Sequence, residues 1–184
     1  AAQQGNSQQE ASSQMQRALE KLQQAQRDMQ QNQRGRSRNS VSDLRSRAAG
    51  AASKQQEIQK QLDDLVKRQN EPGSQESRQR LAEKKDQLAN EVSGIEQELD
   101  QTARGMSGEQ QKSADQLREA ANGLRRNQVA NRIRRNNSNI ASNQMQTAQE
   151  GERVIQQNLN ELVNQLQAAE QGAKQSAKNQ KGAG

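Results

Sequence analysis

The sequence predicts an all-α protein, an elongated antiparallel helical bundle or coiled coil of four to five long helices. Apolar residues recur at alternating steps of three and four, which is the spacing of a helix face packed at a coiled-coil angle. Turn signals interrupt this pattern about every 35 residues. The chain has no Phe, Trp, Tyr, His or Cys, whereas 36 of its 184 residues are Gln.

The apolar content limits the core that these helices can build. Leu, Ile, Val and Met together contribute 28 residues. Burying one such side chain gains about 2 kcal/mol, whereas ordering one residue costs about 1.5 kcal/mol. We therefore expect thin seams between helices, or disorder, and not one dense core. Residues 1–9 and 172–184 are rich in Gly, Ala, Gln and Lys and are predicted to be disordered tails, which leaves residues 10–171 as the helical region.

The first two helices are predicted on either side of a break at residues 35–40. In that break Ser40 and Asp43 have the spacing of a capping box. The seam of the first helix consists of Ala11, Met15, Ala18, Leu22, Ala25 and Met29. The seam of the second consists of Val41, Leu44, Ala48, Ala51, Gln55, Ile58, Leu62 and Leu65.

The later helices are separated by three further breaks. Residues 70–74 give the strongest turn signal, because they contain the only proline. Residues 105–108 form the next break, with Ser107 and Gln110 again at capping-box spacing, and the Asn-rich residues 136–139 form a weaker one. The seam of the third helix consists of Leu81, Lys85, Leu88, Val92, Ile95, Leu99, Thr102 and Met106. The last seam consists of Met145, Ala148, Glu152, Ile155, Leu159, Leu162, Leu166 and Ala169.

Polar residues at seam positions have two interpretations. A buried Gln55 would set the register of the helices by hydrogen bonding, at a cost in stability. Alternatively the seam is only partly buried and water satisfies the amide. We favour the second interpretation, because Gln and Asn are also abundant outside the seams. Lys84 and Lys85 stand beside Glu83 and Asp86 and are interpreted as ordinary surface pairs.

The missing residue types exclude several function classes. Without His and Cys the chain lacks the usual general base, the thiol nucleophile and the commonest metal ligands. Without aromatic residues it has no platform on which bases of a single strand could stack. No glycine-rich phosphate loop and no nucleophile with a neighbouring base is visible. We expect no catalytic, cofactor-binding or metal-binding residues, no enzymatic activity, no small-molecule substrate and no specific recognition of nucleic acid.

One segment, residues 120–149, contains no acidic residue and carries five arginines. The candidate anion-binding residues are Arg125, Arg126, Arg132, Arg134 and Arg135. On one continuous helix the first, third and fifth of these fall within an arc of about 80°, a local positive field that could hold phosphate or an anionic headgroup. The alternative, which we favour, is a solvated face whose Arg stems cover Val129 and Ile133.

Three stretches resemble a known family. Residues 18–26 (ALEKLQQAQ), residues 54–62 (KQQEIQKQL) and residues 151–166 are similar to the long helical region of large bacterial membrane-anchored proteins, the domain of unknown function 4175 family. In that family transmembrane helices lie N-terminal, and Gln/Arg-rich amphipathic helices follow outside the membrane. The resemblance covers residues 10–171. It implies a bacterial origin, a periplasmic or other extracytoplasmic location and a scaffold role, and it assigns no functional residue.

Together these observations predict a non-enzymatic structural or scaffold module without a cofactor, which associates with itself or with another protein. The chain opens Ala1-Ala2-Gln3 without Met. We expect a piece of a larger bacterial envelope protein, with a mature product as the alternative. The alternative function is binding of an anionic surface, either lipid headgroups or nucleic acid, through residues 125–135. Such binding would weaken with rising salt, whereas a scaffold contact through apolar seams would not.

Overall fold

The computed structural model describes residues 2–68, 71–106 and 108–181, and within these ranges it contains helices and no strands. This confirms the predicted all-α fold class. The elements are α1 (Ala2–Lys67), α2 (Ser74–Arg104), the short 3-10 helix η1 (Gly108–Gln110), α3 (Gln111–Arg126), α4 (Val129–Ala141) and α5 (Met145–Lys181). The chain divides into two compact units, Ala1–Ser37 and Arg38–Gly184.

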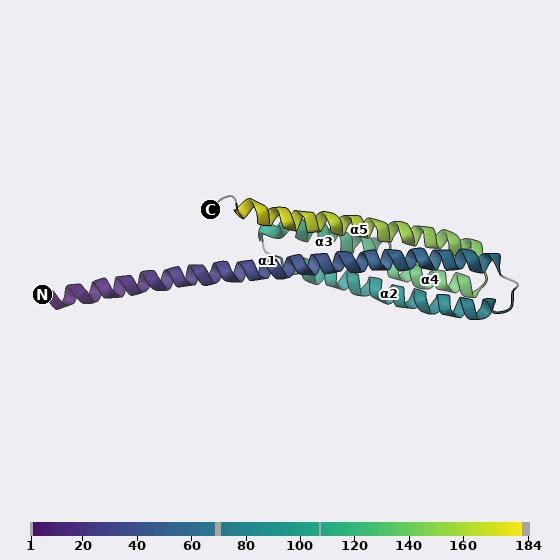
Figure 1. The fold of residues 1–184 in the computed structure, drawn as a ribbon, viewed down its shortest axis with the longest axis horizontal. Helices are drawn as coiled ribbons and strands as arrows, with labels where there is room; N and C mark the ends of the chain where they lie inside the picture. The colour runs from purple at the N-terminus through teal and green to yellow at the C-terminus, as the bar shows by residue number, and fades with distance from the viewer. Residues whose placement is uncertain (1, 69–70, 107, 182–184) are drawn as a thin grey trace. The chain divides into compact units, whose positions relative to one another are not determined.

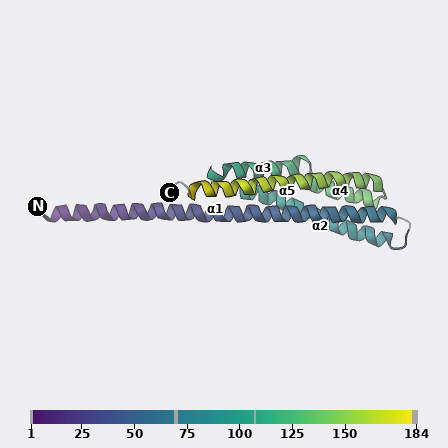
Figure 2. The ribbon, with the colours of Figure 1, turned by 45° about the horizontal axis from the view of Figure 1, so that its top comes forward.

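The second unit is a four-helix bundle. Its four corners are residues 38–67 of α1, helix α2, the consecutive helices α3 and α4, and helix α5 (Figure 1). Helix α2 packs against α3 and α4, and both of these pack against α5. Residues 38–67 close the bundle, since Lys54 donates to Glu91 of α2 at 2.6 Å and Gln156 of α5 donates to the carbonyl oxygen of Ala52 at 3.3 Å. Consecutive corners run in opposite directions (Figure 2), as short connections require.

One continuous apolar core fills this bundle, so the expectation of thin seams is wrong. All eight seam positions predicted between Val41 and Leu65 are buried, and so are all eight predicted between Met145 and Ala169. Fully buried alanines, among them Ala48, Ala89 and Ala148, lie between the larger side chains. Because alanine lets neighbouring helices approach closely, few large side chains are needed to fill the interior at protein density.

The predicted break at residues 35–40 is wrong, because α1 continues through it. A glycine inside a helix costs only about 1 kcal/mol, and the neighbouring arginines are good helix formers. Helix also extends past the expected boundaries of the tails, since α1 begins at Ala2 and α5 ends at Lys181. High helix propensities of Ala, Gln and Lys account for this extension. The assignment of residues 1–9 and 172–184 as disordered tails stays a prediction.

Two predicted breaks are confirmed. The turn after α1 contains Gly73 with φ 93°, a left-handed conformation that favours glycine, and the amide of Glu71 donates to the carbonyl oxygen of Arg68 at 3.0 Å. Helix α2 ends at Arg104, and α3 begins at Gln111 after η1, so the predicted break between these two helices is present. The predicted cap at Ser107 lies outside the described residues.

The predicted break at residues 136–139 is wrong, because these residues lie inside α4. The chain instead turns on either side of that helix, with Gln128 (φ 48°) between α3 and α4 and Asn143 (φ 60°) between α4 and α5. Asn tolerates the left-handed conformation better than most residues, since its short side chain can hydrogen-bond locally. Gln128 carries no such preference, so the sequence gives no signal for this turn.

Candidate functional site

The turn between α3 and α4 separates the five candidate arginines into two groups. Arg125 and Arg126 end α3, whereas Arg132, Arg134 and Arg135 lie on α4. The single positive arc expected of one continuous helix is therefore absent, because the left-handed Gln128 interrupts the helix between the two groups. All five side chains are exposed.

Carboxylates neutralise the two candidate arginines at the end of α3. Arg125 Nε donates to Glu96 Oε1 at 2.9 Å, and its Nη2 pairs with Asp100, so one guanidinium bridges two acidic residues of α2. Arg126 pairs with Glu119 on its own helix. These two cations serve contacts within the bundle and do not project an uncompensated charge.

The three arginines of α4 meet only neutral partners within the described part of the chain. Arg132 Nε donates to the carbonyl oxygen of Asn127 at 2.7 Å, near the end of α3. Arg134 donates to Asn90 Oδ1 at 3.1 Å, and Arg135 donates to Gln128 Oε1 at 3.0 Å. None of these three guanidinium groups forms an ion pair with a carboxylate among the described residues, although Glu150 lines the same groove as Arg132 and Arg135. Whether any of the five arginines binds an anion stays a prediction.

A second constellation, which sequence reasoning did not assemble, lies inside the bundle. Each of the four corners contributes one polar side chain to it: Gln55 from α1, Lys85 from α2, Asn136 from α4 and Glu152 from α5. Gln55, Lys85 and Glu152 are 0% exposed and Asn136 is 4% exposed. We call these four residues the polar layer.

Glu152 is the hub of the polar layer. One of its carboxylate oxygens, Oε1, pairs with Lys85 Nζ and accepts a hydrogen bond of 2.7 Å from Asn136 Nδ2. The other, Oε2, accepts a hydrogen bond from Gln55 Nε2, which also lies 3.3 Å from the carbonyl oxygen of Glu152. Gln55 Oε1 is buried without a hydrogen-bond partner. The carboxylate therefore ties together all four corners of the bundle.

Two interpretations from the sequence are corrected here. Gln55 is not satisfied by water at a half-buried seam, because it is enclosed and hydrogen-bonded to Glu152. Lys85 does not form an ordinary surface pair, because helix periodicity turns it inward while its neighbour Lys84 turns outward to Glu57, at 2.9 Å. The signal for both lay in the seam pattern, which had placed Gln55, Lys85 and Glu152 at apolar positions.

Gly151 makes room for the fourth member of the polar layer. A Cβ at this position would lie 2.6 Å from Asn136 Cγ and 2.9 Å from its Nδ2, closer than side chains can pack. The Asn136 amide is held there by bonds to the carbonyl oxygen of Ala148 at 2.9 Å and from Asn139 Nδ2 at 3.1 Å. The glycine on α5 and the asparagine on α4 therefore form a matched pair.

Burial has a definite electrostatic effect on the polar layer. It lowers the pKa of Lys85 below its ordinary value, because the apolar surroundings disfavour the charged ammonium, while the Glu152 carboxylate opposes this shift. Both side chains are fully enclosed, so they cannot reach a substrate in this conformation. A buried ion pair of this kind contributes little net stability, but it penalises any register that separates its partners.

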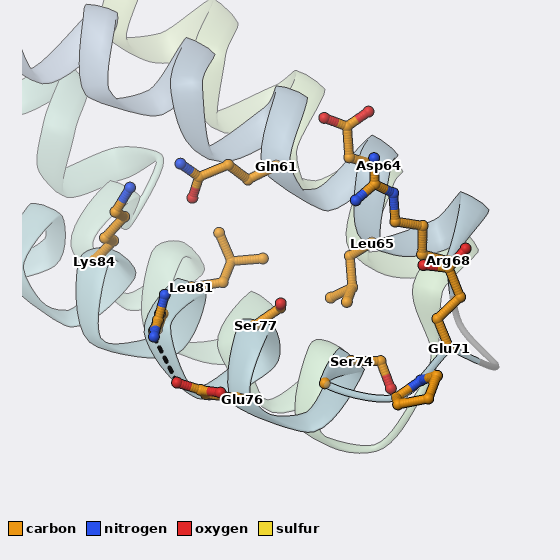
Figure 3. A pocket seen from close by; sticks show the side chains of 13 residues that line it. Gln61, Asp64, Leu65, Arg68, Glu71, Ser74, Glu76, Ser77, Leu81 and Lys84 are labelled. Atoms are coloured by element: carbon orange, nitrogen blue, oxygen red, sulfur yellow. Dashed lines mark hydrogen bonds and ion pairs between the residues drawn. The ribbon is translucent and has the colours of Figure 1, made fainter.

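An open groove of about 530 Å³ lies beside the turn between α1 and α2 (Figure 3). Leu65 and Leu81 line its floor, and charged side chains surround them. The charged residues are Asp64, Arg68, Glu71, Glu76, Arg80 and Lys84. Three acidic and three basic residues balance one another, and Arg80 is already paired with Glu76. The groove therefore selects neither an anion nor a cation.

A third feature lies in the first unit. Every residue from 14 to 33 is exposed, including four large apolar side chains: Met15 (72%), Leu19 (57%), Leu22 (69%) and Met29 (74%). Of the seam predicted for the first helix, five members are therefore exposed, namely Met15, Ala18, Leu22, Ala25 and Met29, whereas the side chain of Ala11 lies outside the described residues. Leu19 was not part of that seam, although its spacing from Met15 and Leu22 places it on the same helix face.

The described residues contain no group of three acidic side chains placed to hold a metal ion. Nor does any helix in the described ranges have the length and hydropathy needed to cross a bilayer. Comparison of the chain with models of protein families, with curated proteins and with solved structures gave no match.

Proposed function

We propose that this chain is a non-enzymatic structural and interaction module. In this proposal the bundle of residues 38–181 serves as the scaffold, and residues 14–33 of α1 provide the surface that contacts a partner. The observation that carries the proposal is the row of exposed Met15, Leu19, Leu22 and Met29 on one helix. Amphipathic helices bind partners through apolar anchors at this spacing.

Physical chemistry supports a partner for this segment. A helix without tertiary packing is only marginally stable in water, since most helical stability in proteins comes from burying an apolar face. Residues 14–33 have no such burial. The bundle differs, because its apolar core is buried internally and the Glu152 carboxylate of its polar layer accepts hydrogen bonds from within the bundle. The segment therefore gains helical stability from docking, whereas the bundle needs no partner to bury its apolar residues.

Hydrogen exchange on the full chain tests this proposal. At a dilute concentration we expect the amides of residues 38–175 to exchange slowly and those of residues 14–33 to exchange nearly as fast as in an unfolded chain, because packing protects only the first group. Strong protection of residues 14–33 in the dilute monomer would overturn the proposal, since the segment would then already be packed and not free for a partner.

A second candidate function is binding of an anionic surface through α4. The observation favouring it concerns Arg132, Arg134 and Arg135. Among the described residues, the hydrogen-bond partners of these three arginines are all neutral. Replacing all three by Gln keeps helix propensity and removes three positive charges. If the candidate is correct, this variant binds vesicles with anionic headgroups at least tenfold more weakly than the parent at low salt. The matched control replaces Arg118, Arg125 and Arg126, which already have carboxylate partners.

The control should bind more strongly than the α4 variant. If both variants bind the vesicles equally, the arginines of α4 do not form an anion-binding site and are ordinary solvated surface residues. Binding of vesicles and of duplex DNA is measured at low and at physiological salt. Binding to either ligand should weaken as salt rises, and the ligand that the parent chain binds distinguishes a lipid surface from nucleic acid.

We further propose an extracytoplasmic location in a larger bacterial envelope protein. This rests on the resemblance of residues 18–26, 54–62 and 151–166 to the helical region of membrane-anchored proteins. The gene around the coding sequence provides the test. A hydrophobic segment of about 20 residues encoded upstream in the same reading frame would support this location, and an unrelated start codon directly before Ala1 would contradict it.

A further inference from the structure

We propose that residues 14–33 of α1 pair antiparallel with the same segment of a second copy of this chain. This inference rests on the proposed interaction role of the segment and specifies the partner and the geometry. The observations that lead to it are the exposed apolar face, the distribution of charge around that face and the alternation of large and small side chains along it.

The face of the segment that carries these apolar side chains contains no charged residue. At 100° per residue, Met15, Leu19 and Met29 all lie within about 60° of Leu22, together with Ala18, Ala25, Gln26 and Gln33. The charged residues of the segment point elsewhere, and the nearest, Lys21, lies about 100° from Leu22. A face without charge and with methionine and leucine anchors suits an equally apolar helix, and not an anionic or cationic partner.

One antiparallel register sets large side chains of this face opposite small ones. Aligning Gln23 with the partner's Gln24 places residues 14–33 of one helix beside residues 33–14 of the other. In this register Leu22 faces the partner's Ala25, and Ala18 faces the partner's Met29. In these central layers a large side chain meets a small one, which is how helices interdigitate. At both ends of the register Met15 faces the partner's Asn32. The arrangement is isologous and closes as a dimer.

Charge decides between the two possible directions. Lys21 and Asp28 lie on the same edge of the apolar face, seven residues apart. In an antiparallel pair the same edges of the two helices face each other, so each Lys21 approaches the partner's Asp28, twice per dimer. In a parallel pair this edge faces the opposite one, which carries Leu19, Gln26 and Gln33 and no charge. Flanking charges of this kind set helix orientation in coiled coils.

Sedimentation equilibrium of the full chain, from about 1 µM to about 500 µM, tests for the dimer. We expect a monomer–dimer equilibrium. Replacing Met15, Leu22 and Met29 together by Gln keeps the helix propensity and should raise the dimer dissociation constant at least a hundredfold. The control variant replaces Gln16, Gln24 and Gln31 by Ala on the opposite face and should dimerise like the parent.

Charge exchange tests the direction. Changing Lys21→Asp alone places acidic residues opposite one another twice and should raise the dissociation constant severalfold at low salt. Adding Asp28→Lys restores complementarity in the antiparallel dimer and should restore the affinity. In a parallel dimer the second change would have no reason to compensate for the first.

Disulfide trapping locates the register, because the chain contains no cysteine of its own. A chain with Ala18→Cys is mixed with a chain of different mass that carries Met29→Cys, and the mixture is oxidised gently. The antiparallel register predicts the mixed disulfide, since these positions face each other. Disulfides joining Ala18→Cys to itself would show a parallel dimer and would overturn the proposal.

Two further results would also overturn it. The first is a chain that stays monomeric over the whole concentration range, and the second is an association that survives the loss of Met15, Leu22 and Met29. If the chain is monomeric and the amides of residues 14–33 exchange rapidly, the proposed interaction role is retained, but the partner must be a different protein. A monomer whose residues 14–33 are protected would reject both proposals, so the two failures are distinguishable.

Discussion

Lys85 is fully buried whereas its neighbour Lys84 is exposed, so a substitution at Lys85 tests the polar layer. Replacing Lys85 by Met leaves the Glu152 carboxylate buried without its cation, which should cost about 3–5 kcal/mol of stability. Urea denaturation followed by far-ultraviolet circular dichroism measures this loss. The control is Lys84→Met, since Lys84 is 44% exposed and its pair with Glu57 is worth less than about 1 kcal/mol.

A second substitution distinguishes two causes of the lost stability, the burial of an unpaired charge and the loss of packing. Replacing Glu152 by Met in the Lys85→Met background removes the remaining charge, so we expect most of the lost stability to return. If the double variant were as unstable as the single one, the loss would have to come from packing or from the hydrogen bonds of Gln55 and Asn136 to Glu152, and not from an uncompensated charge.

Gly151 gives a second test at the scale of residues. In an ordinary helix Gly→Ala stabilises by about 1 kcal/mol, but here the added Cβ would overlap the Asn136 amide, so Gly151→Ala should destabilise by about 1–3 kcal/mol. In a background with Asn136→Ala the overlap disappears, and the same substitution should become neutral or stabilising. A double-mutant cycle with thermal unfolding measures this coupling, and additivity would contradict it.

The sequence predicted part of the polar layer and missed its assembly. Heptad spacing placed Gln55, Lys85 and Glu152 at inward positions, because that spacing depends on each helix alone. Asn136 was assigned to a break, since it stands in an Asn-rich run. Which of these residues meet depends on the stagger between helices, and that stagger is set by turns whose geometry the sequence does not state.

Replacing glycine by alanine should change the stability of the bundle in opposite directions at two positions, one in a turn and one inside a helix. Gly73, in the turn after α1, has φ 93°, so Gly73→Ala should destabilise the bundle by about 1–2 kcal/mol. Gly50 lies inside α1, and a Cβ there would meet no atom within 4 Å, so Gly50→Ala should stabilise by up to about 1 kcal/mol. Thermal unfolding of both variants checks the signs, and equal signs would contradict the assigned backbone conformations.

The limits of prediction for whole helices have a physical cause. Helix α2, helix α5 and the second half of α1 followed from long apolar seams, which tertiary packing reinforces. The turn at Gly73 followed from proline and glycine. The continuity of α1 through Gly35 was missed, because a glycine penalty of about 1 kcal/mol is small beside the packing that follows it. The interruption at Gln128 was missed, because nothing in its side chain favours a left-handed conformation.

Acid should weaken the whole bundle partly through Glu170 on α5. Its hydrogen bond to Lys174 lowers the pKa of Glu170, and the nearby charge of Arg45 on α1 acts in the same direction. Because the carboxyl holds its proton less tightly in the folded state, the stabilisation is present above its ordinary pKa of 4.5 and is lost as the pH falls through the lower, folded value.

Replacing Glu170 by Gln should therefore lower the unfolding temperature at neutral pH and flatten its dependence on pH below about pH 5. Thermal unfolding of the parent and the variant at a series of pH values measures both effects. Parallel curves for the two proteins would show that Glu170 does not contribute to the acid sensitivity.

The polar layer also has a consequence for the order of folding. Gln55 and Glu152 lie 97 residues apart in the chain, and Lys85 and Glu152 lie 67 apart. The layer closes only when the last long helix docks, so its contacts should be absent from the folding transition state. Weakening them would then leave the folding rate almost unchanged and speed up unfolding. The buried carboxylate would therefore slow the unfolding of the native bundle without changing the rate at which the bundle folds.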